Sequence, residues 1–158
     1  MVALIDIYSR KIMGWALSTF LDTKVCMKAL HKALTKGMPS IINSDQGCQF
    51  TSQEWVAALQ NLNIQVSMDG KGRWVDNKYI ERLWRTIKYE FVWLYCFESV
   101  TELHQGLSKY LDRYNSMRLH ASLDYMTPTE IYDNFFNQNE RDVDEIVTPL
   151  DIQPALSY

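Results

Sequence analysis

The alternation of apolar and polar positions divides the chain into short strands and amphipathic helices. The first 18 residues contain two β-rich runs, at about 2–7 and 11–18, broken at Ser9 and Arg10, a pattern typical of a β-hairpin. The first run is apolar on both faces, which predicts a strand covered on both sides. Further short runs at 40–43 and 64–69 predict two more strands.

Apolar residues at helical spacing predict the helices between and after these strands. Asp22 can cap the first of them, and Gly37 and Pro39 can end it. The order of elements predicts an α/β fold, with one mixed sheet and helices packed on it. The four clearest helical segments are residues 22–36, the stretch after Ser52, residues 77–94 and residues 100–116.

The last part of the chain differs in composition from the rest. Thr127 precedes Pro128, a residue suited to the first turn of a helix. From Asn137 onward acids outnumber bases, and we expect an extended or partly disordered tail. We therefore divide the chain into a core over residues 1–132 and an acidic tail over 133–158.

Composition narrows the class of protein only loosely. The chain has 158 residues, of which 47% are hydrophobic, and it can form one compact core. Its net charge of -3 gives no overall field attractive to nucleic acid, so such a partner would need a local basic patch. The three cysteines lie far apart without metal-binding spacing. No apolar run is long enough to cross a membrane, and we expect a soluble, cytoplasmic protein.

Two carboxylates are the candidate chemistry. Asp45 follows the short strand at 40–43, and Glu81 lies one turn into the helix at 77–94. Ligands of open α/β sheets usually bind at the carboxyl ends of strands, which favours a functional Asp45. Each residue also has a simpler interpretation: Asp45 can be a turn former ahead of Gly47, and Glu81 an ordinary surface glutamate.

A basic stretch surrounds the second carboxylate. Residues 71–88 hold six cations against two acids, a local balance of +4 in an acidic protein. Arg85 and Lys88 lie four and seven residues after Glu81 and project from the same helix face. A solvated surface with ion pairs four residues apart would look similar. Carboxylates beside cations also suit an anionic substrate brought to Mg²⁺.

Four motifs, in order, resemble the integrase-core transposases of bacterial insertion sequences, which are akin to retroviral integrases and have a ribonuclease H-like fold. They cover about residues 2–132. The motifs are "LIDIYSRKIMGW", "NSDQGCQFTS", "VSMDGKGRWVDNKYIERLWRTIKYE" and "YNSMRLHASLDYMTPTEIY".

The resemblance implies DDE-type chemistry, in which divalent ions, Mg²⁺ or Mn²⁺, support DNA strand cleavage and transfer. It implies that Asp45 and Glu81 are catalytic carboxylates that bind the metal. Gly47 and Gln49 would shape the loop after Asp45. Three cations, Lys71, Arg85 and Lys88, would contact the phosphates of transposon DNA, and Asn77 would lie near the site.

The chain also departs from the family pattern. The family's first catalytic Asp lies on a strand before the hairpin, and that strand is not present here, so we expect an amino-terminally truncated core that binds metal weakly and cleaves no DNA by itself. Asp6 is expected to anchor the hairpin turn and not to replace that acid. His120 could contact DNA or hold a structural hydrogen bond.

Two other functions stay open at this point. A non-catalytic fragment of the same fold could pair an exposed sheet edge and form a homo-oligomer such as a dimer. A DNA-binding module could act through the basic stretch alone, with affinity that falls steeply with salt and survives loss of both carboxylates.

Overall fold

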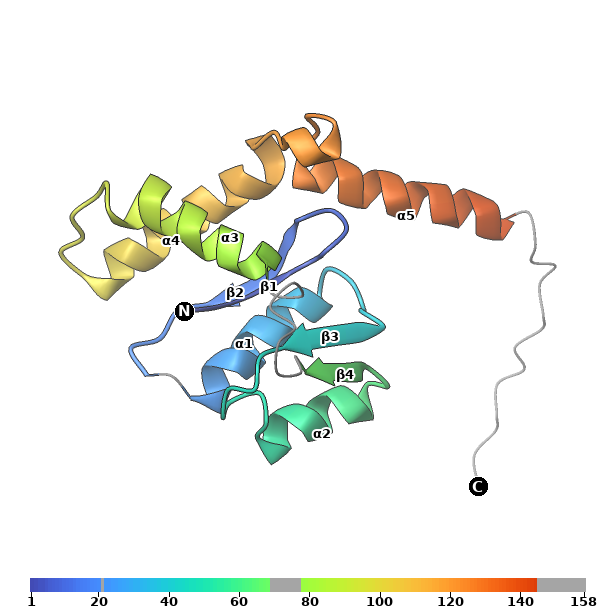
Figure 1. Ribbon diagram of the computed structural model, residues 1–158, viewed down its shortest axis with the longest axis horizontal. Helices are drawn as coiled ribbons and strands as arrows, with labels where there is room; N and C mark the ends of the chain where they lie inside the picture. The colour runs from blue at the N-terminus through green and yellow to red at the C-terminus, as the bar shows by residue number, and fades with distance from the viewer. Residues whose placement is uncertain (21, 69–77, 145–158) are drawn as a thin grey trace, which may run out of the picture.

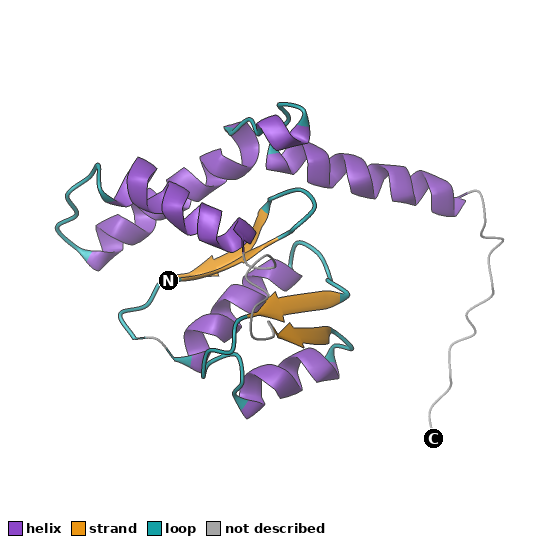
Figure 2. Cartoon of the chain, viewed as in Figure 1, coloured by secondary structure: helices purple, strands orange, loops and turns teal. Residues whose placement is uncertain are grey.

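A computed structural model describes residues 1–20, 22–68 and 78–144 of the chain, with side chains through residue 138 (Figure 1). The described residues form short strands and longer helices, with the helices in the majority (Figure 2). Lys71 and Asn77, two of the predicted site residues, lie outside the described residues.

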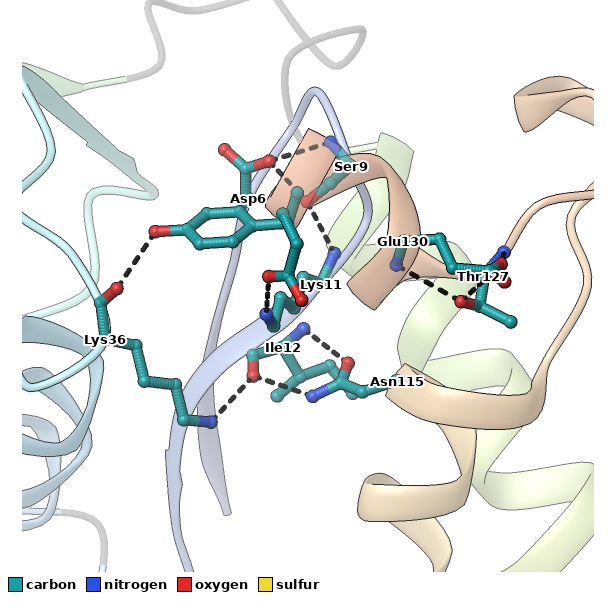
Figure 3. Close-up of polar contacts among 10 residues, drawn as sticks. Asp6, Ser9, Lys11, Ile12, Lys36, Asn115, Thr127 and Glu130 are labelled. Atoms are coloured by element: carbon teal, nitrogen blue, oxygen red, sulfur yellow. Dashed lines mark hydrogen bonds and ion pairs between the residues drawn. The ribbon is translucent and has the colours of Figure 1, made fainter. Parts of the chain in front are cut away.

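The chain begins with the predicted hairpin. Strands β1 (Val2–Ile5) and β2 (Ile12–Ala16) are antiparallel, with Val2 opposite Ala16. In the turn between them, Asp6 Oδ2 accepts hydrogen bonds from the Ser9 amide at 2.7 Å and the Ser9 hydroxyl at 2.6 Å (Figure 3). The predicted role of Asp6 as the anchor of this turn is confirmed.

Helix α1 (Thr23–Leu34) packs against the hairpin. Its first turn is capped by Asp22, whose side chain accepts from the Val25 amide at 3.0 Å. The contact with β2 is close, because a Cβ built on Gly14 would lie 2.2 Å from the carbonyl oxygen of Ala29. Because Gly14 has no side chain, the backbones of β2 and α1 can come into direct contact here. The buried face of α1 consists of Val25, Cys26, Ala29, Leu30 and Ala33.

The second pair of strands is parallel. Strands β3 (Ile41–Ser44) and β4 (Gln65–Met68) run side by side, joined by helix α2 (Gln53–Asn61). Ser52 caps α2, as its sequence position predicts, by accepting from the Trp55 amide. The sequence predicted one mixed sheet, but the antiparallel and parallel pairs are separate two-stranded sheets, because no described strand joins β1 to β3.

Two hydrophobic clusters cover the hairpin on its two faces. One cluster includes Val2 and Ala16 with residues of α1, α2 and β3. The other includes Ile12, with Ala3 and Trp15 packed around it, and is built from the helices that follow β4. The prediction of a strand covered on both sides is therefore confirmed.

Helix α3 (Lys78–Ile87) continues directly into a π-helical turn, η1 (Lys88–Val92). The sequence predicted one uniform helix over 77–94. In the structure the Trp93 amide donates to the Lys88 carbonyl at 3.0 Å, five residues back. A π turn holds an extra residue, and here Phe91 is buried while its neighbour Glu90 faces Arg118.

Helix α4 (Val100–Met117) runs against α3 and the hairpin. Near the carboxyl end of α4, the Asn115 side chain forms two hydrogen bonds with the backbone of Ile12, the first residue of β2 (Figure 3). Asn115 Oδ1 accepts from the Ile12 amide at 2.8 Å, and Asn115 Nδ2 donates to the Ile12 carbonyl at 3.0 Å. After α4, a short 3-10 turn, η2 (Ala121–Leu123), leads to the last helix.

Helix α5 (Pro128–Asp144) corrects the prediction for the tail: residues 137–144 are helical rather than extended. Its start is a capping box, in which the Glu130 amide donates to Thr127 Oγ1 and the Thr127 amide donates to Glu130 Oε2 (Figure 3). Once such a helix has started, each further residue costs little. The tail prediction for residues 145–158 lies outside the described residues.

Candidate active site

Asp45 lies just past the carboxyl end of β3, in an exposed loop. Its Oδ1 accepts a hydrogen bond from the Gly47 amide at 2.9 Å, the turn geometry that the simpler interpretation predicts. The carbonyl of Gly47 then accepts from the amides of Phe50 and Thr51. Gly47 therefore shapes the loop after Asp45. Within the described part of the chain, this turn uses one carboxylate oxygen in a single hydrogen bond and leaves Asp45 accessible.

Glu81 lies in the first turn of α3 and is exposed. Among the described residues it has no hydrogen bond and no ion pair. Glu90, nine residues further along the helix, shows the opposite situation, since Arg118 binds both of its oxygens and Tyr110 donates to it. The Arg118 guanidinium lowers the pKa of the Glu90 carboxyl. Of these two glutamates, Glu90 is therefore bound by neighbouring side chains and Glu81 is exposed to solvent.

The two carboxylates come from two separate segments of the chain. Asp45 follows β3, and Glu81 begins the helix that comes after β4, the parallel neighbour of β3. In Figure 1 the arrowheads of β3 and β4 and the first turn of α3 lie toward the centre of the view. No contact between the two carboxylates is found among the described residues, so their meeting at a shared ion stays a prediction.

Arg85 and Lys88 are both exposed and follow Glu81 along the helix. The Arg85 guanidinium lies 5.8 Å from the centre of the Tyr89 ring, and neither cation forms an ion pair with a described carboxylate. The interpretation of this face as a row of paired surface charges is therefore not supported by the described residues. Both side chains remain accessible to an anion.

A second group of basic residues borders the other flank of α3, and the sequence analysis named only His120 among them, as a candidate DNA contact. The Arg10 guanidinium lies 3.7 Å from the centre of the Tyr79 ring. His120 packs its ring on Tyr114, with centroids 5.3 Å apart. Burial, followed by the charges of Arg118, Arg10 and Arg82, lowers the pKa of His120. For Arg10, the signal in the sequence was its place in one of the four motifs.

The described residues contain no group of three His, Cys, Asp or Glu side chains that could hold a metal ion. Asp45 and Glu81 could therefore supply at most a part of such a site from the described chain. No described helix is long and apolar enough to cross a membrane.

The arrangement of strands and helices is that of the ribonuclease H-like fold. The structure is similar to the HTLV-2 integrase catalytic core domain solved in complex with magnesium in a dimeric form, with a TM-score of 0.63 and 22% identity, covering 80% of this chain and 79% of that one. It is also similar to a chain of the simian T-cell lymphotropic virus intasome in complex with PP2A regulatory subunit B56 gamma, with a TM-score of 0.70 and 18% identity, covering 98% of this chain and 51% of that one.

The chain belongs to the integrase-core family. Two models of the integrase core domain match it, over residues 1–73 and 62–128. It is 35% identical over 130 residues to the transposase for insertion sequence element IS904 of Lactococcus lactis, covering 80% of this chain and 51% of that protein. It is 30% identical over 129 residues to the putative transposase InsK for IS150 of Escherichia coli, covering 80% of this chain and 46% of that protein.

The chain thus contains the integrase core domain, and the family predicted from the four motifs is confirmed. It spans about half the length of the curated relatives that it matches.

Proposed function

We propose that this core cuts and joins DNA strands with divalent metal ions bound by Asp45 and Glu81. The observation that supports the proposal most is the contrast among the acids: Asp45 and Glu81 are exposed and form no ion pair with described residues, whereas Asp6 and Glu90 are bound within the protein. Accessible carboxylates that can share an ion are what a metal-dependent phosphoryl-transfer site needs.

The donor atoms fit the expected metal. Mg²⁺ takes oxygen ligands and is commonly bound by one or two carboxylates together with substrate phosphates. Asp45 and Glu81 are two exposed carboxylates, so the chain offers the kind of protein ligand that Mg²⁺ commonly takes. When bound, such ions activate the attacking water or hydroxyl and stabilise the leaving oxygen of a DNA phosphodiester. Lys71 and Asn77 remain predicted participants, since they lie outside the described residues.

Residues of the chain itself have three tasks in this proposal. The Gly47 amide holds one oxygen of Asp45 and so orients its carboxylate. Helix α3 fixes Glu81 in its first turn. Arg85 and Lys88, on the same face, would contact DNA phosphates and hold the strand beside the carboxylates.

Strand cleavage tests this proposal. The transposase that contains this chain would be assayed with DNA carrying the ends of its insertion sequence, in Mg²⁺ or Mn²⁺. We expect Asp45→Asn and Glu81→Gln each to lower the cleavage rate by about 100-fold or more, because a lost electrostatic contact in the transition state costs that much. Asp112→Asn, which changes an exposed carboxylate on α4, is the matched control and should cleave normally. Undiminished cleavage by both site variants would refute the assignment.

We further propose that the chain acts on DNA as a homo-oligomer. The HTLV-2 integrase core was solved in dimeric and trimeric forms, which makes self-association a reasonable expectation for a chain of this fold. Light scattering at several protein concentrations tests this point. A mass that stays monomeric throughout the range would contradict it.

A further inference from the structure

Three basic side chains from three separate elements surround the first turn of α3 on one flank. Arg10 comes from the turn of the hairpin, Arg82 from α3, and His120 from the segment before η2. Arg10 stacks on the ring of Tyr79 at 3.7 Å, and Tyr79 lies one helical turn before Arg82. Residues three apart share a face of a helix, so Arg10 lies on the side of α3 that carries Arg82.

The backbone and the neighbouring rings hold His120 in place. Its amide donates to the Met126 carbonyl at 3.2 Å, and its ring meets the edge of Tyr114 at 5.3 Å. Tyr114 belongs to the same hydrophobic cluster as Leu83 and Ile87 of α3, so His120 lies beside that helix. Burial, followed by the charges of Arg118, Arg10 and Arg82, lowers the pKa of His120, in keeping with this position.

The charge of this group is not compensated within the described protein. Arg118, which also lies near His120, is bound by Glu90 through two hydrogen bonds. Arg10 and Arg82 form no ion pair with a described carboxylate. Like charges that face one another at close range repel, so an arrangement of this kind favours binding of an anion.

Two buried polar atoms of the group also lack a partner. Arg10 Nη1 and His120 Nε2 are both shielded from solvent and make no hydrogen bond with a described residue. Buried polar groups in folded proteins nearly always have a partner, and each exception needs an explanation. Because both atoms are shielded in this arrangement, an oxyanion bonds to them only after the Arg10 and His120 side chains turn toward it. Its oxygens then accept hydrogen bonds from a guanidinium and from a ring N–H.

We propose that Arg10, Arg82 and His120 bind a backbone phosphate of DNA, on the flank of α3 that faces away from Glu81 and Lys88. A DNA strand is favoured over a free anion because the exposed surface of α3 between the two flanks carries further cations, Lys78 and Arg85. The proposal rests on the proposed function, since it takes DNA as the substrate. It adds a second point of attachment, built from the hairpin and the segment after α4.

Salt-dependent DNA binding tests the proposal with the 158-residue chain. Affinity for a duplex of about 20 base pairs would be measured by fluorescence anisotropy at several salt concentrations. We expect Arg10→Gln and Arg82→Gln each to weaken binding about tenfold and to reduce the salt slope by about 1, the effect of one lost phosphate contact. Arg113→Gln, an exposed arginine on α4, is the charge-matched control and should keep the slope.

His120 is tested by removing the ring nitrogen atoms that can form hydrogen bonds. His120→Phe keeps a ring against Tyr114 but removes the hydrogen-bonding atoms, and we expect it to weaken binding severalfold. Arg10→Lys keeps the charge and should restore the salt slope that Arg10→Gln loses. Amide NMR spectra of each variant without DNA confirm that the fold is intact.

The outcomes separate this inference from the proposed function. Unchanged affinity and slope in Arg10→Gln and Arg82→Gln, with DNA still bound, would overturn the phosphate site and leave the proposed function standing. Equal loss in Arg113→Gln would also overturn it, because the effect would then follow net charge alone. Failure of the unaltered chain to bind any duplex at low salt would count against the site and the DNA-acting function together.

Discussion

The hairpin turn and the loop after β3 both begin with an aspartate at the end of a strand, yet the two acids have different surroundings. Asp6 is partly buried, and one of its oxygens accepts from both the amide and the hydroxyl of Ser9. Asp45 is exposed and accepts from a single amide, that of Gly47. The difference teaches that position after a strand does not by itself distinguish a structural acid from a candidate catalytic one.

The same contrast extends to the surroundings of each turn. The hairpin is bound to distant parts of the chain. The Asn115 side chain forms hydrogen bonds with the Ile12 backbone (Figure 3), and Lys11 forms an ion pair with Asp133. The loop after β3 is held mainly by its own backbone, through the Gly47 carbonyl. One region therefore stabilises the fold, and the other presents a carboxylate to solvent. Substitutions can break or sharpen this comparison.

The largest expected effect on stability is at Asn115, whose side chain forms hydrogen bonds with the Ile12 backbone. Asn115→Ala removes both hydrogen bonds to the Ile12 backbone, and we expect it to lower the free energy of unfolding by about 2–3 kcal/mol, because partly buried backbone groups lose their partner. Chemical denaturation measures the change. Asn134→Ala, on the exposed surface of α5, is the control and should have little effect. An equal loss in both variants would show that the two hydrogen bonds of Asn115 make no specific contribution to the free energy of unfolding.

A smaller effect is expected from the two aspartates themselves. Asp6→Ala removes two hydrogen bonds from the hairpin turn and should cost about 1–2 kcal/mol of unfolding free energy. Asp45→Ala removes one exposed bond and should cost about 0.5 kcal/mol. Thermal or chemical unfolding of the two variants compares them directly. If Asp45→Ala proved the more destabilising, Asp45 would be primarily a structural residue.

The two glutamates on the helix that runs from α3 into η1 come last, with the smallest effect of all expected at Glu81. Glu90→Gln removes the ion pair with Arg118 and should cost about 0.5–1 kcal/mol, since the pair is solvent-accessible. Glu81→Gln should leave the free energy of unfolding unchanged.

The effect of Glu90 should depend on pH in a defined direction. Its pKa is lowered in the folded protein by Arg118, so its contribution is present above the unfolded pKa, near 4.5. The contribution is lost as the pH falls through the lower folded value. The difference in unfolding free energy between the unaltered chain and Glu90→Gln should therefore shrink below about pH 4.5. A difference that grows on acidification would contradict this account.

Local signals in the sequence were sufficient for much of the fold. Asp22 and Ser52 cap the helices that follow them, and both caps were predicted from residue type and position alone. The hairpin was predicted from its β-rich runs, and the family from its four motifs. These features depend on contacts within a few residues or on a long ordered pattern, and both are visible in a single chain.

Other features depend on contacts between distant segments. The π turn at Lys88–Val92 accompanies the contact between Glu90 and Arg118, which lie 28 residues apart. The helical course of residues 137–144 follows from a well-capped start at Thr127, despite their acidic composition. The group around Arg10 and His120 brings together the two ends of the core. Periodicity and composition carry no information about such pairings.

The candidate site could be predicted in part. Asp45 and Glu81 were identified from the resemblance, and the structure places both in exposed positions. Arg85 and Lys88 are likewise exposed and follow Glu81 along the helix. Lys71 and Asn77 stay predictions, because they lie outside the described residues.

Paramagnetic line broadening by Mn²⁺ tests the shared ion most directly. In amide NMR spectra of the chain, low concentrations of Mn²⁺ should broaden the signals of Gln46 and Gly47 together with those of Glu81 and Arg82. Glu81→Gln should remove the broadening at Gln46 and Gly47, because each carboxylate supplies part of one site. Broadening at only one of the two segments, or broadening near Asp45 that persists in Glu81→Gln, would contradict the account.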